Sequence, residues 1–81
     1  MSTAAMLDGL VEELRATRLP SPAVRRRLRE EAGLSLRDVA RVLGVAPMSV
    51  HRWEAGIVKI KRENARHYRE FLDALQEVSS S

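Results

Sequence analysis

Residues 35–56 read S-L-R-D-V-A-R-V-L-G-V-A-P-M-S-V-H-R-W-E-A-G, and this stretch decides the fold. Its first four residues have the spacing of a capping box, with Asp in place of the usual Glu, which predicts a short helix that stops at Gly44. A second short helix is expected to begin at Pro47, because proline is tolerated at the first helical position, and to end before Gly56. Residues 44–46 then form the short connection that is typical of a helix-turn-helix.

The helix expected over residues 47–55 has two faces of different chemistry. At about 100° per residue, Val50, Trp53 and Ala46 mark the side that faces the protein. Glu54 also turns back toward the protein. The outward side is formed by Met48, Arg52 and Ala55, with Ser49 and His51 on its flanks. An arginine can donate two hydrogen bonds to a guanine and an apolar tip can touch a thymine methyl group, which is the chemistry of a major-groove reader. A solvated surface with one exposed methionine is the alternative, and the helix spacing favours the reader.

The start of the chain predicts a separate amphipathic helix over about residues 4–17. Its apolar stripe, at i, i+3, i+4 and i+7 spacing, consists of Leu7, Leu10, Val11 and Leu14. We expect the prolines that follow to end this helix, because residues before a proline are pushed out of the helical region. The stripe has to be buried against something. It either packs on the chain's own last helix or forms a two-fold contact with another chain.

Two further helices complete the chain. Ser21 caps one helix with Pro22 at its first position, and Gly33 closes it after about Ala32. The other spans about residues 62–78, and the residues along its apolar side are Ala65, Tyr68, Leu72, Leu75 and Val78. No segment alternates apolar and polar residues, so the sequence predicts an all-α fold of five helices. The expected organisation is an amphipathic helix and proline-containing linker over 1–20, a helix-turn-helix domain over 21–78, and a disordered tail over 79–81.

Positive charge is concentrated in the middle of the chain. Residues 21–69 hold twelve Lys or Arg against five Asp or Glu, whereas both flanking segments carry net negative charge. Such clustering points to a polyanionic partner, with nucleic acid ahead of a membrane. Codon usage is the alternative explanation, because twelve of the fourteen basic residues are Arg.

Catalytic and metal-binding functions have no support in the sequence. There is no cysteine, and His51 and His67 are too few to complete a four-ligand zinc site. No nucleophile stands beside a base, so we expect neither an enzyme nor a cofactor, and no small-molecule ligand. No apolar run approaches the roughly 20 residues of a membrane span, and the start of the chain lacks a secretory signal. We therefore expect a cytoplasmic protein without a membrane partner.

The stretch L-R-E-E-A-G-L-S-L-R-D-V-A-R-V-L-G-V-A-P-M-S-V-H-R-W-E-A-G, residues 28–56, resembles the Cro/C1-type helix-turn-helix domain of phage repressors and bacterial Xre-like regulators. The resemblance covers about residues 22–75. It implies a five-helix, lambda-repressor-like domain whose third helix reads operator bases. Here the equivalent helix is the fourth, because residues 1–19 precede the shared core and add an N-terminal helix.

The resemblance also implies roles for individual residues. Those at its DNA-contacting positions are Ala46, Pro47, Met48 and Arg52 for bases, Ser49 and His51 on the flanks, and Lys59 and Lys61 for backbone phosphates. Arg29 and Glu54 match a structural ion pair between the first core helix and the end of the reading helix. Arg25 or Arg26 lies where a phosphate contact is expected, although a solvated helix face is the alternative.

Two positions depart from the family pattern. The first position of the helix-turn-helix is commonly Gln, which contacts phosphate and braces the reading helix, and Leu36 can do neither. Arg37 or nearby backbone N–H groups are expected to substitute for it. Pro47 cannot donate a hydrogen bond to a base, so it is expected to fix the start of the helix rather than to read sequence.

These observations predict a sequence-specific regulator that binds double-stranded operator DNA, a repressor from a phage or a bacterium with similar genes. A homodimer would suit paired half-sites about one helical turn apart. The alternative is a protein-interaction module, such as an antitoxin or an adaptor, that uses the same fold to bind a protein partner.

Overall fold

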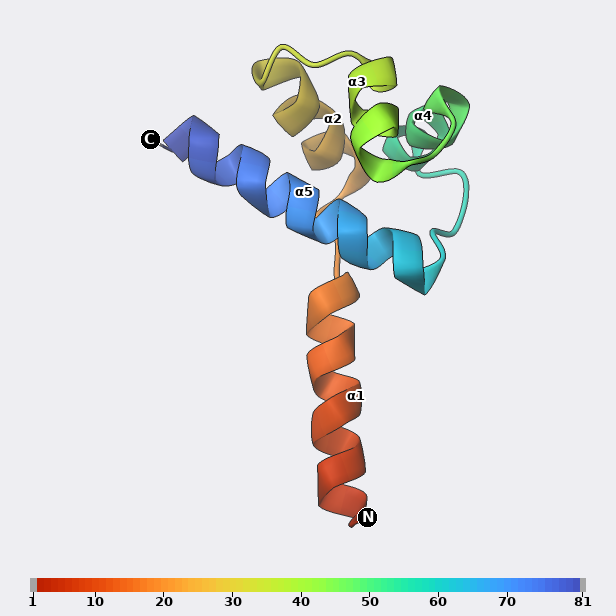
Figure 1. The fold of residues 1–81 in the computed structure, drawn as a ribbon, viewed down its shortest axis with the longest axis vertical. Helices are drawn as coiled ribbons and strands as arrows, with labels where there is room; N and C mark the ends of the chain where they lie inside the picture. The colour runs from red at the N-terminus through yellow and green to blue at the C-terminus, as the bar shows by residue number, and fades with distance from the viewer. Residues whose placement is uncertain (1, 81) are drawn as a thin grey trace.

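The computed structural model describes residues 2–80, and these residues form five helices and no strand (Figure 1). The helices are α1 (Thr3–Thr17), α2 (Pro22–Glu31), α3 (Leu36–Leu43), α4 (Pro47–Ala55) and α5 (Arg62–Ser80). The predicted all-α class is confirmed. The serine tail differs from the expectation, because α5 continues through Ser80, and residue 81 lies outside the described residues.

The ends of the core helices follow from local chemistry. The Ser35 hydroxyl accepts a hydrogen bond from the Asp38 N–H at 3.0 Å, and an Asp38 carboxylate oxygen accepts one from the Ser35 N–H at 2.9 Å. The capping box at the start of α3 is therefore present. α4 ends at Gly56, whose φ of 71° is left-handed. A Cβ at this position would also lie 2.9 Å from Cγ of Pro22, so the turn requires glycine in two ways.

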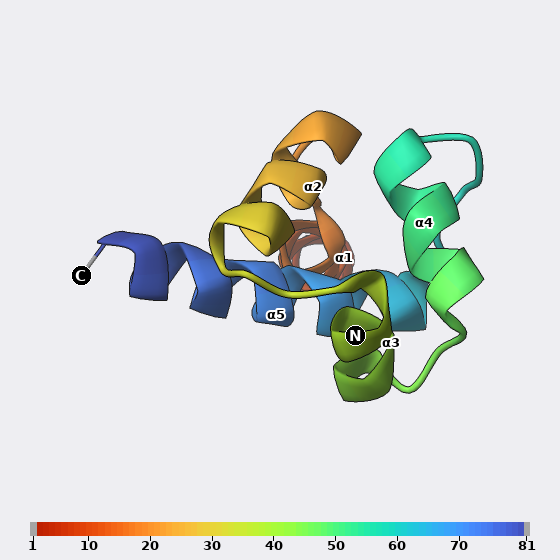
Figure 2. The same ribbon diagram turned by 90° about the horizontal axis from the view of Figure 1, so that it is seen from above.

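The helices α2, α3 and α4 lie together on one side of α5, and α1 lies on the other side (Figures 1 and 2). α3 and α4 pack against each other, and α2 contacts both α4 and α5. α1 meets α5 with its C-terminal end, near the middle of α5, and projects away from α2, α3 and α4 (Figure 1). The helix-turn-helix and the N-terminal helix therefore point in different directions.

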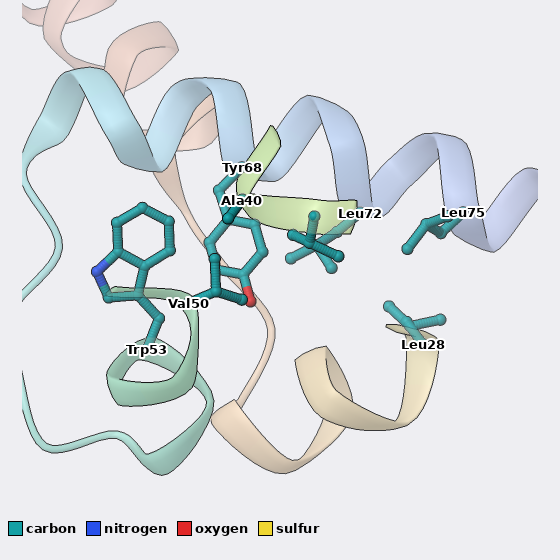
Figure 3. Close-up of a cluster of buried hydrophobic side chains, with 8 residues drawn as sticks. Leu28, Ala40, Val50, Trp53, Tyr68, Leu72 and Leu75 are labelled. Carbon is teal, nitrogen blue, oxygen red and sulfur yellow. The ribbon is translucent and has the colours of Figure 1, made fainter. Parts of the chain in front are cut away.

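The core lies where α5 meets α3, α4 and α2 (Figure 3). Trp53 of α4 and Tyr68 of α5 form its aromatic centre, with ring centroids 5.1 Å apart and planes tilted by 38°. The other members of this buried cluster are Leu28, Val39, Ala40, Val50, Leu72 and Leu75. Val78, which was expected on the apolar side of the last helix, is 72% exposed, because α5 extends beyond the elements that cover it.

The apolar stripe of α1 is not buried, so of the two expected alternatives the packing of the stripe on the chain's own last helix is not found, although the C-terminal end of α1 contacts α5. Its four residues remain between 42% and 55% exposed, and no residue of α1 is buried. What fixes α1 is its polar C-terminal end. Glu13 pairs with Arg62 at 3.4 Å and with Arg66 at 3.8 Å. The guanidinium of Arg69 donates hydrogen bonds to the backbone carbonyls that end α1.

The stability of the core is expected to fall in alkaline solution because of Tyr68, the single tyrosine of the chain. Burial, and next the nearby charge of Glu54, raise its pKa to about 12. In the unfolded chain this phenol ionises near pH 10. Between about pH 10 and 12 the unfolded state therefore binds fewer protons, and the free energy of unfolding falls by up to about 1.4 kcal/mol per pH unit. Denaturant unfolding across this range measures the slope.

Tyr68→Phe is the matched control for this titration, because it keeps the ring and removes the ionising group. Its stability should depend less steeply on pH in the same window, while other groups that titrate there affect both proteins equally. Identical slopes for the two proteins would contradict the assignment to Tyr68.

Candidate nucleic-acid interface

The outward face of α4 is open to solvent. Met48 is 55% exposed, and Arg52, His51 and Ala55 are exposed beside it. Ser49 is half-buried at the edge of this face. The opposite side is fixed to the core through Val50, Trp53 and the side chain of Glu54, which is 6% exposed. α1 does not cover the outward face, since it projects from the other side of α5 (Figure 1).

The start of α4 has no side-chain cap, and its available backbone donor is the N–H of Met48, because Pro47 has no N–H and Ser49 donates to the carbonyl of Ala46 at 2.9 Å. Ala46 is the N-cap residue, and its side chain makes no capping hydrogen bond. Pro47 occupies the first helical position, where it sets the backbone angle φ. Its missing N–H costs no hydrogen bond there, because a backbone N–H at this position has no acceptor within the helix. Ala46 is exposed, although the helical wheel placed it toward the protein, because the wheel does not apply to a residue with an extended backbone. This end of the helix can approach an anion closely.

An ion pair joins α2 to the end of α4. Nε of Arg29 lies 2.7 Å from one carboxylate oxygen of Glu54, and Nη2 lies 3.0 Å from the other. Nη1 of Arg29 donates to the carbonyl of Leu34 at 2.9 Å, so the same side chain also holds the loop before α3. The hydrogen bonds that Arg29 donates to Glu54 raise the pKa of its guanidinium. The arrangement fixes the angle at which α4 is presented.

Arg25 is a structural residue in this molecule. Its Nε donates to the carbonyl of Pro20 at 2.8 Å and its Nη1 to the carbonyl of Trp53 at 2.9 Å. It therefore ties the linker after α1 to the last turn of α4, and burial lowers the pKa of its guanidinium. The expected phosphate contact by Arg25 does not fit this geometry. Arg26, the other candidate, pairs with Glu30 on the exposed side of α2.

The basic residues divide into paired and unpaired groups. Nine of the fourteen Lys and Arg side chains make an ion pair or a hydrogen bond to a backbone carbonyl. Within residues 2–80, the side chains without such a partner are Arg18, Arg37, Arg52, Lys59 and Lys61. All but Arg18 come from α3, α4 and the loop after α4. The local excess of positive charge therefore lies around the helix-turn-helix.

Leu36, at the first position of α3, packs partly buried against the edge of the core. A hollow of about 200 Å³ beside it is lined by residues that include Leu36, Arg29 and His51. Next to it, hydrogen bonds from Ser35 hold the pKa of Asp38 below its usual range. The carboxylate of Asp38 thus occupies the backbone N–H of Ser35, and the Ser35 hydroxyl occupies that of Asp38. Arg37, which is exposed and unpaired, is the neighbouring group that remains available to an anion.

Two other kinds of site find no support among residues 2–80. No group of three or more His, Asp or Glu side chains could hold a metal ion there. No helix in the same range is both long and apolar enough to cross a membrane.

Comparison with known families agrees with the geometry. The model of a helix-turn-helix domain family matches residues 26–78, well over half of the chain. The match contains most of α2, all of α3 and α4, and nearly all of α5, and α1 lies outside it. We find no match to the chain among curated proteins or among solved structures.

Proposed function

The chain belongs to the helix-turn-helix family of the Cro/C1 type, and from this premise we propose that it is a sequence-specific, double-stranded DNA-binding regulator of transcription. The observation that carries the proposal is the division of the basic residues. Those left unpaired are concentrated on the helix-turn-helix and its following loop, next to an outward face of α4 that has no acidic residue.

The proposed reader is α4, lying in the major groove. Arg52 donates two hydrogen bonds to a guanine, and Met48 touches a thymine methyl group. Ala46 and Ala55 allow close approach, while Ser49 and His51 reach a phosphate or a base edge from the flanks. Pro47 sets the helix start so that the positive end of α4, with the N–H of Met48, approaches the DNA backbone.

Phosphate contacts fix the position of α4 on the duplex. Lys59 and Lys61 extend from the exposed loop before α5, and Arg37 extends from the first turn of α3. Phosphate contacts supply affinity and register but no sequence information. In this proposal Arg37 takes the role that a glutamine at position 36 has in relatives, and Leu36 serves packing alone.

The proposed outcome of binding is repression. A protein seated on an operator excludes polymerase sterically, and this needs no enzymatic activity, cofactor or small-molecule ligand. The regulator would act in the cytoplasm of a bacterium or of a phage-infected cell, and as a homodimer it would read paired half-sites. Selection of bound sites from random duplex DNA would give the operator sequence and, through repeat spacing, the number of subunits.

Binding to duplex DNA is expected to weaken as salt rises, with a slope of roughly −0.9 in log K per phosphate contacted. Three unpaired cations and the start of α4 predict several such contacts for each copy. Arg52→Ala should cost about 1–3 kcal/mol of binding free energy and relax the preference at one base position. Titrations of a selected duplex and of single-base variants, each at several salt concentrations, measure both effects.

Arg15→Ala is the matched control for Arg52→Ala, because Arg15 pairs with Glu12 on α1, which projects from the side of α5 opposite to the reading face (Figure 1). It should leave the base preference unchanged. Equal binding before and after Arg52→Ala would remove Arg52 from the reading role. No salt-dependent binding to any duplex would contradict the function itself.

A protein-interaction module is the second candidate, and the exposed Met48 and the apolar surface of α1 favour it. Co-purification of a stoichiometric protein partner, together with no measurable DNA affinity, would decide for this alternative.

A further inference from the structure

The apolar face of α1 is a surface feature that the proposed DNA binding leaves unused. Five side chains form it, and we call them the α1 stripe: Met6, Leu7, Leu10, Val11 and Leu14, each between 42% and 61% exposed. The acidic Asp8 and Glu12 lie on the opposite side of the helix at about 100° per residue. An exposed apolar stripe without charge is characteristic of a surface that another element covers.

The chain's own domain does not cover the α1 stripe. The contacts that fix α1 lie at its C-terminal end, where Glu13 pairs with Arg62 and Arg66, and Arg69 donates to the backbone carbonyls of Arg15 and Arg18. These contacts orient α1 away from the domain. The stripe is therefore presented on a helix whose direction is fixed, rather than on a loose tail.

We propose that the α1 stripe pairs with the α1 stripe of a second copy of this chain, with the two helices antiparallel. Leu7, Leu10 and Leu14 have the alternating three- and four-residue spacing of a coiled-coil seam, so the surface is complementary to itself. This association does not depend on DNA binding.

The shape of the molecule selects the antiparallel direction. α1 lies along the longest axis of the molecule, which measures 46 Å, and it meets the rest of the domain near the middle of α5 (Figures 1 and 2). The other two extents of the molecule are 30 and 20 Å, so the domain is much wider than a single helix. Paired helices lie only about 8–10 Å apart. A parallel pair would therefore force the two domains into the same space. An antiparallel pair places them at opposite ends of α1, which is about 22 Å long.

One register satisfies both the apolar and the charged groups. With Leu7 opposite Leu10 of the second copy, Thr3 lies opposite Leu14, and the start of each α1 stops at the base of the other domain. The first turn of α1 contains no acidic residue, and this N-terminal end of the helix carries partial positive charge. In this register that turn lies beside Glu13 of the second copy, which is a favourable pairing.

The size of the contact predicts a weak dimer. Even large side chains bury at most about 150–250 Å² each, so five half-exposed residues supply no more than roughly 500 Å² per copy. Stable complexes bury about 800 Å² per partner. We therefore expect a dissociation constant on the order of 10 µM to 1 mM, with monomer dominant in dilute solution.

Sedimentation equilibrium of the full chain, from about 10 µM to 1 mM, tests the association. Leu10→Glu should raise the dissociation constant at least ~10-fold, because each copy would bury a carboxylate in the contact. Ala5→Glu is the matched control, since it adds the same charge to the exposed polar side of the same helix. Both variants should keep the thermal unfolding of the domain, because α1 holds no core residue.

Three results would overturn the proposal. They are a chain that stays monomeric throughout this range, equal effects of the two substitutions, or a stoichiometric binding partner other than this chain on the stripe. Binding to a single DNA half-site should be the same for wild type and Leu10→Glu. Failure of the dimer is thereby distinguished from failure of the proposed DNA-binding function.

A separate measurement tests whether the two helices pair antiparallel. Because the chain has no cysteine, a single introduced cysteine can carry a spin label at a chosen position. The Ser2→Cys variant, carrying a spin label on its cysteine, is mixed with unlabelled, isotope-enriched wild-type protein, whose amide signals are then recorded by nuclear magnetic resonance. An antiparallel dimer should broaden the amide signals of the second copy near Ala16, at the base of its domain. Broadening confined to the first turn of α1 would mean that the helices are parallel, which would overturn the arrangement.

Discussion

Glu54→Ala is expected to lower the free energy of unfolding by about 3–5 kcal/mol, the usual cost of removing one partner from a buried ion pair. Both groups are well shielded, with the side chain of Arg29 14% exposed and that of Glu54 6% exposed. Without this carboxylate, the guanidinium keeps the hydrogen bond to the carbonyl of Leu34 and a long ion pair, at 3.9 Å, with the exposed Glu30. For a chain of this size the midpoint of thermal unfolding should fall by more than about 10 °C, which circular dichroism measures directly.

Two further variants test whether the loss of stability comes from the burial of this ion pair or from the removal of any charged side chain. Arg26→Ala removes an exposed partner of Glu30 and should cost no more than about 1 kcal/mol. The double variant Arg29→Met, Glu54→Leu replaces the whole pair with apolar groups and should recover much of the lost stability, because no buried charge is left without a partner. A loss for Glu54→Ala as small as that for Arg26→Ala would contradict this assignment.

The ion pair also matters for the proposed reading of DNA. Arg29 connects α2 and the loop before α3, and Glu54 belongs to the last turn of α4. Loss of the pair therefore loosens the helix that presents Arg52 as well as lowering global stability. DNA affinity measured well below the unfolding midpoint should fall for Glu54→Ala, even though Glu54 does not face the groove.

The helix boundaries of the core were predictable because they depend on neighbouring residues. The capping box that begins at Ser35 and the glycines after α3 and α4 act within one helical turn. The residues that set these helix ends are therefore adjacent in the sequence and can be recognised there. The inward side of α4 was predictable for the same reason, since helical periodicity places Val50, Trp53 and Glu54 together. Local chemistry is sufficient for such features.

The role of Arg25 and the exposure of α1 were not predictable, because both depend on the complete fold. The acceptors of Arg25 are the backbone carbonyls of Pro20 and Trp53. Because every residue has a backbone carbonyl, the sequence does not indicate which carbonyl a side chain will contact. The stripe of α1 shows that a face is apolar without showing what covers it. Arg69 fixes α1 through backbone carbonyls as well, so the direction of α1 had no sequence signal.

The candidate interface lies between these two cases. Positions on α4 follow from periodicity, but whether a basic side chain is free for DNA depends on its partners in the fold. Arg25 and Arg52 look alike in the sequence, yet only Arg52 lacks a protein partner among the described residues. The unpaired cations therefore mark the candidate interface more selectively than the basic residues as a whole, and which cations are unpaired is decided by the fold.

Trp53→Ala is expected to cost about 3–5 kcal/mol, the range for removing a large aromatic side chain from a core. Trp53 is 5% exposed and lies 5.1 Å from the ring of Tyr68, so its loss opens a cavity between α4 and α5 (Figure 3). For a chain of this size the midpoint of thermal unfolding should fall by more than about 10 °C, as for Glu54→Ala. Far-ultraviolet circular dichroism during heating measures this without relying on the lost tryptophan.

In the same experiment, Trp53→Phe distinguishes the contribution of the aromatic ring contact to stability from that of the backbone hydrogen bond at residue 53. It keeps an aromatic ring beside Tyr68, and the carbonyl of residue 53 can still accept from Arg25, so its loss of stability should be clearly smaller than that of the alanine variant. If the two variants melted alike, the ring contact would contribute little and the position of α4 would depend on the backbone and ion-pair contacts alone. If both melted like the wild type, α4 would not be held to α5 by this side chain. The reading face would then rest on Arg29 and Glu54, whose substitution would have the larger effect on DNA affinity.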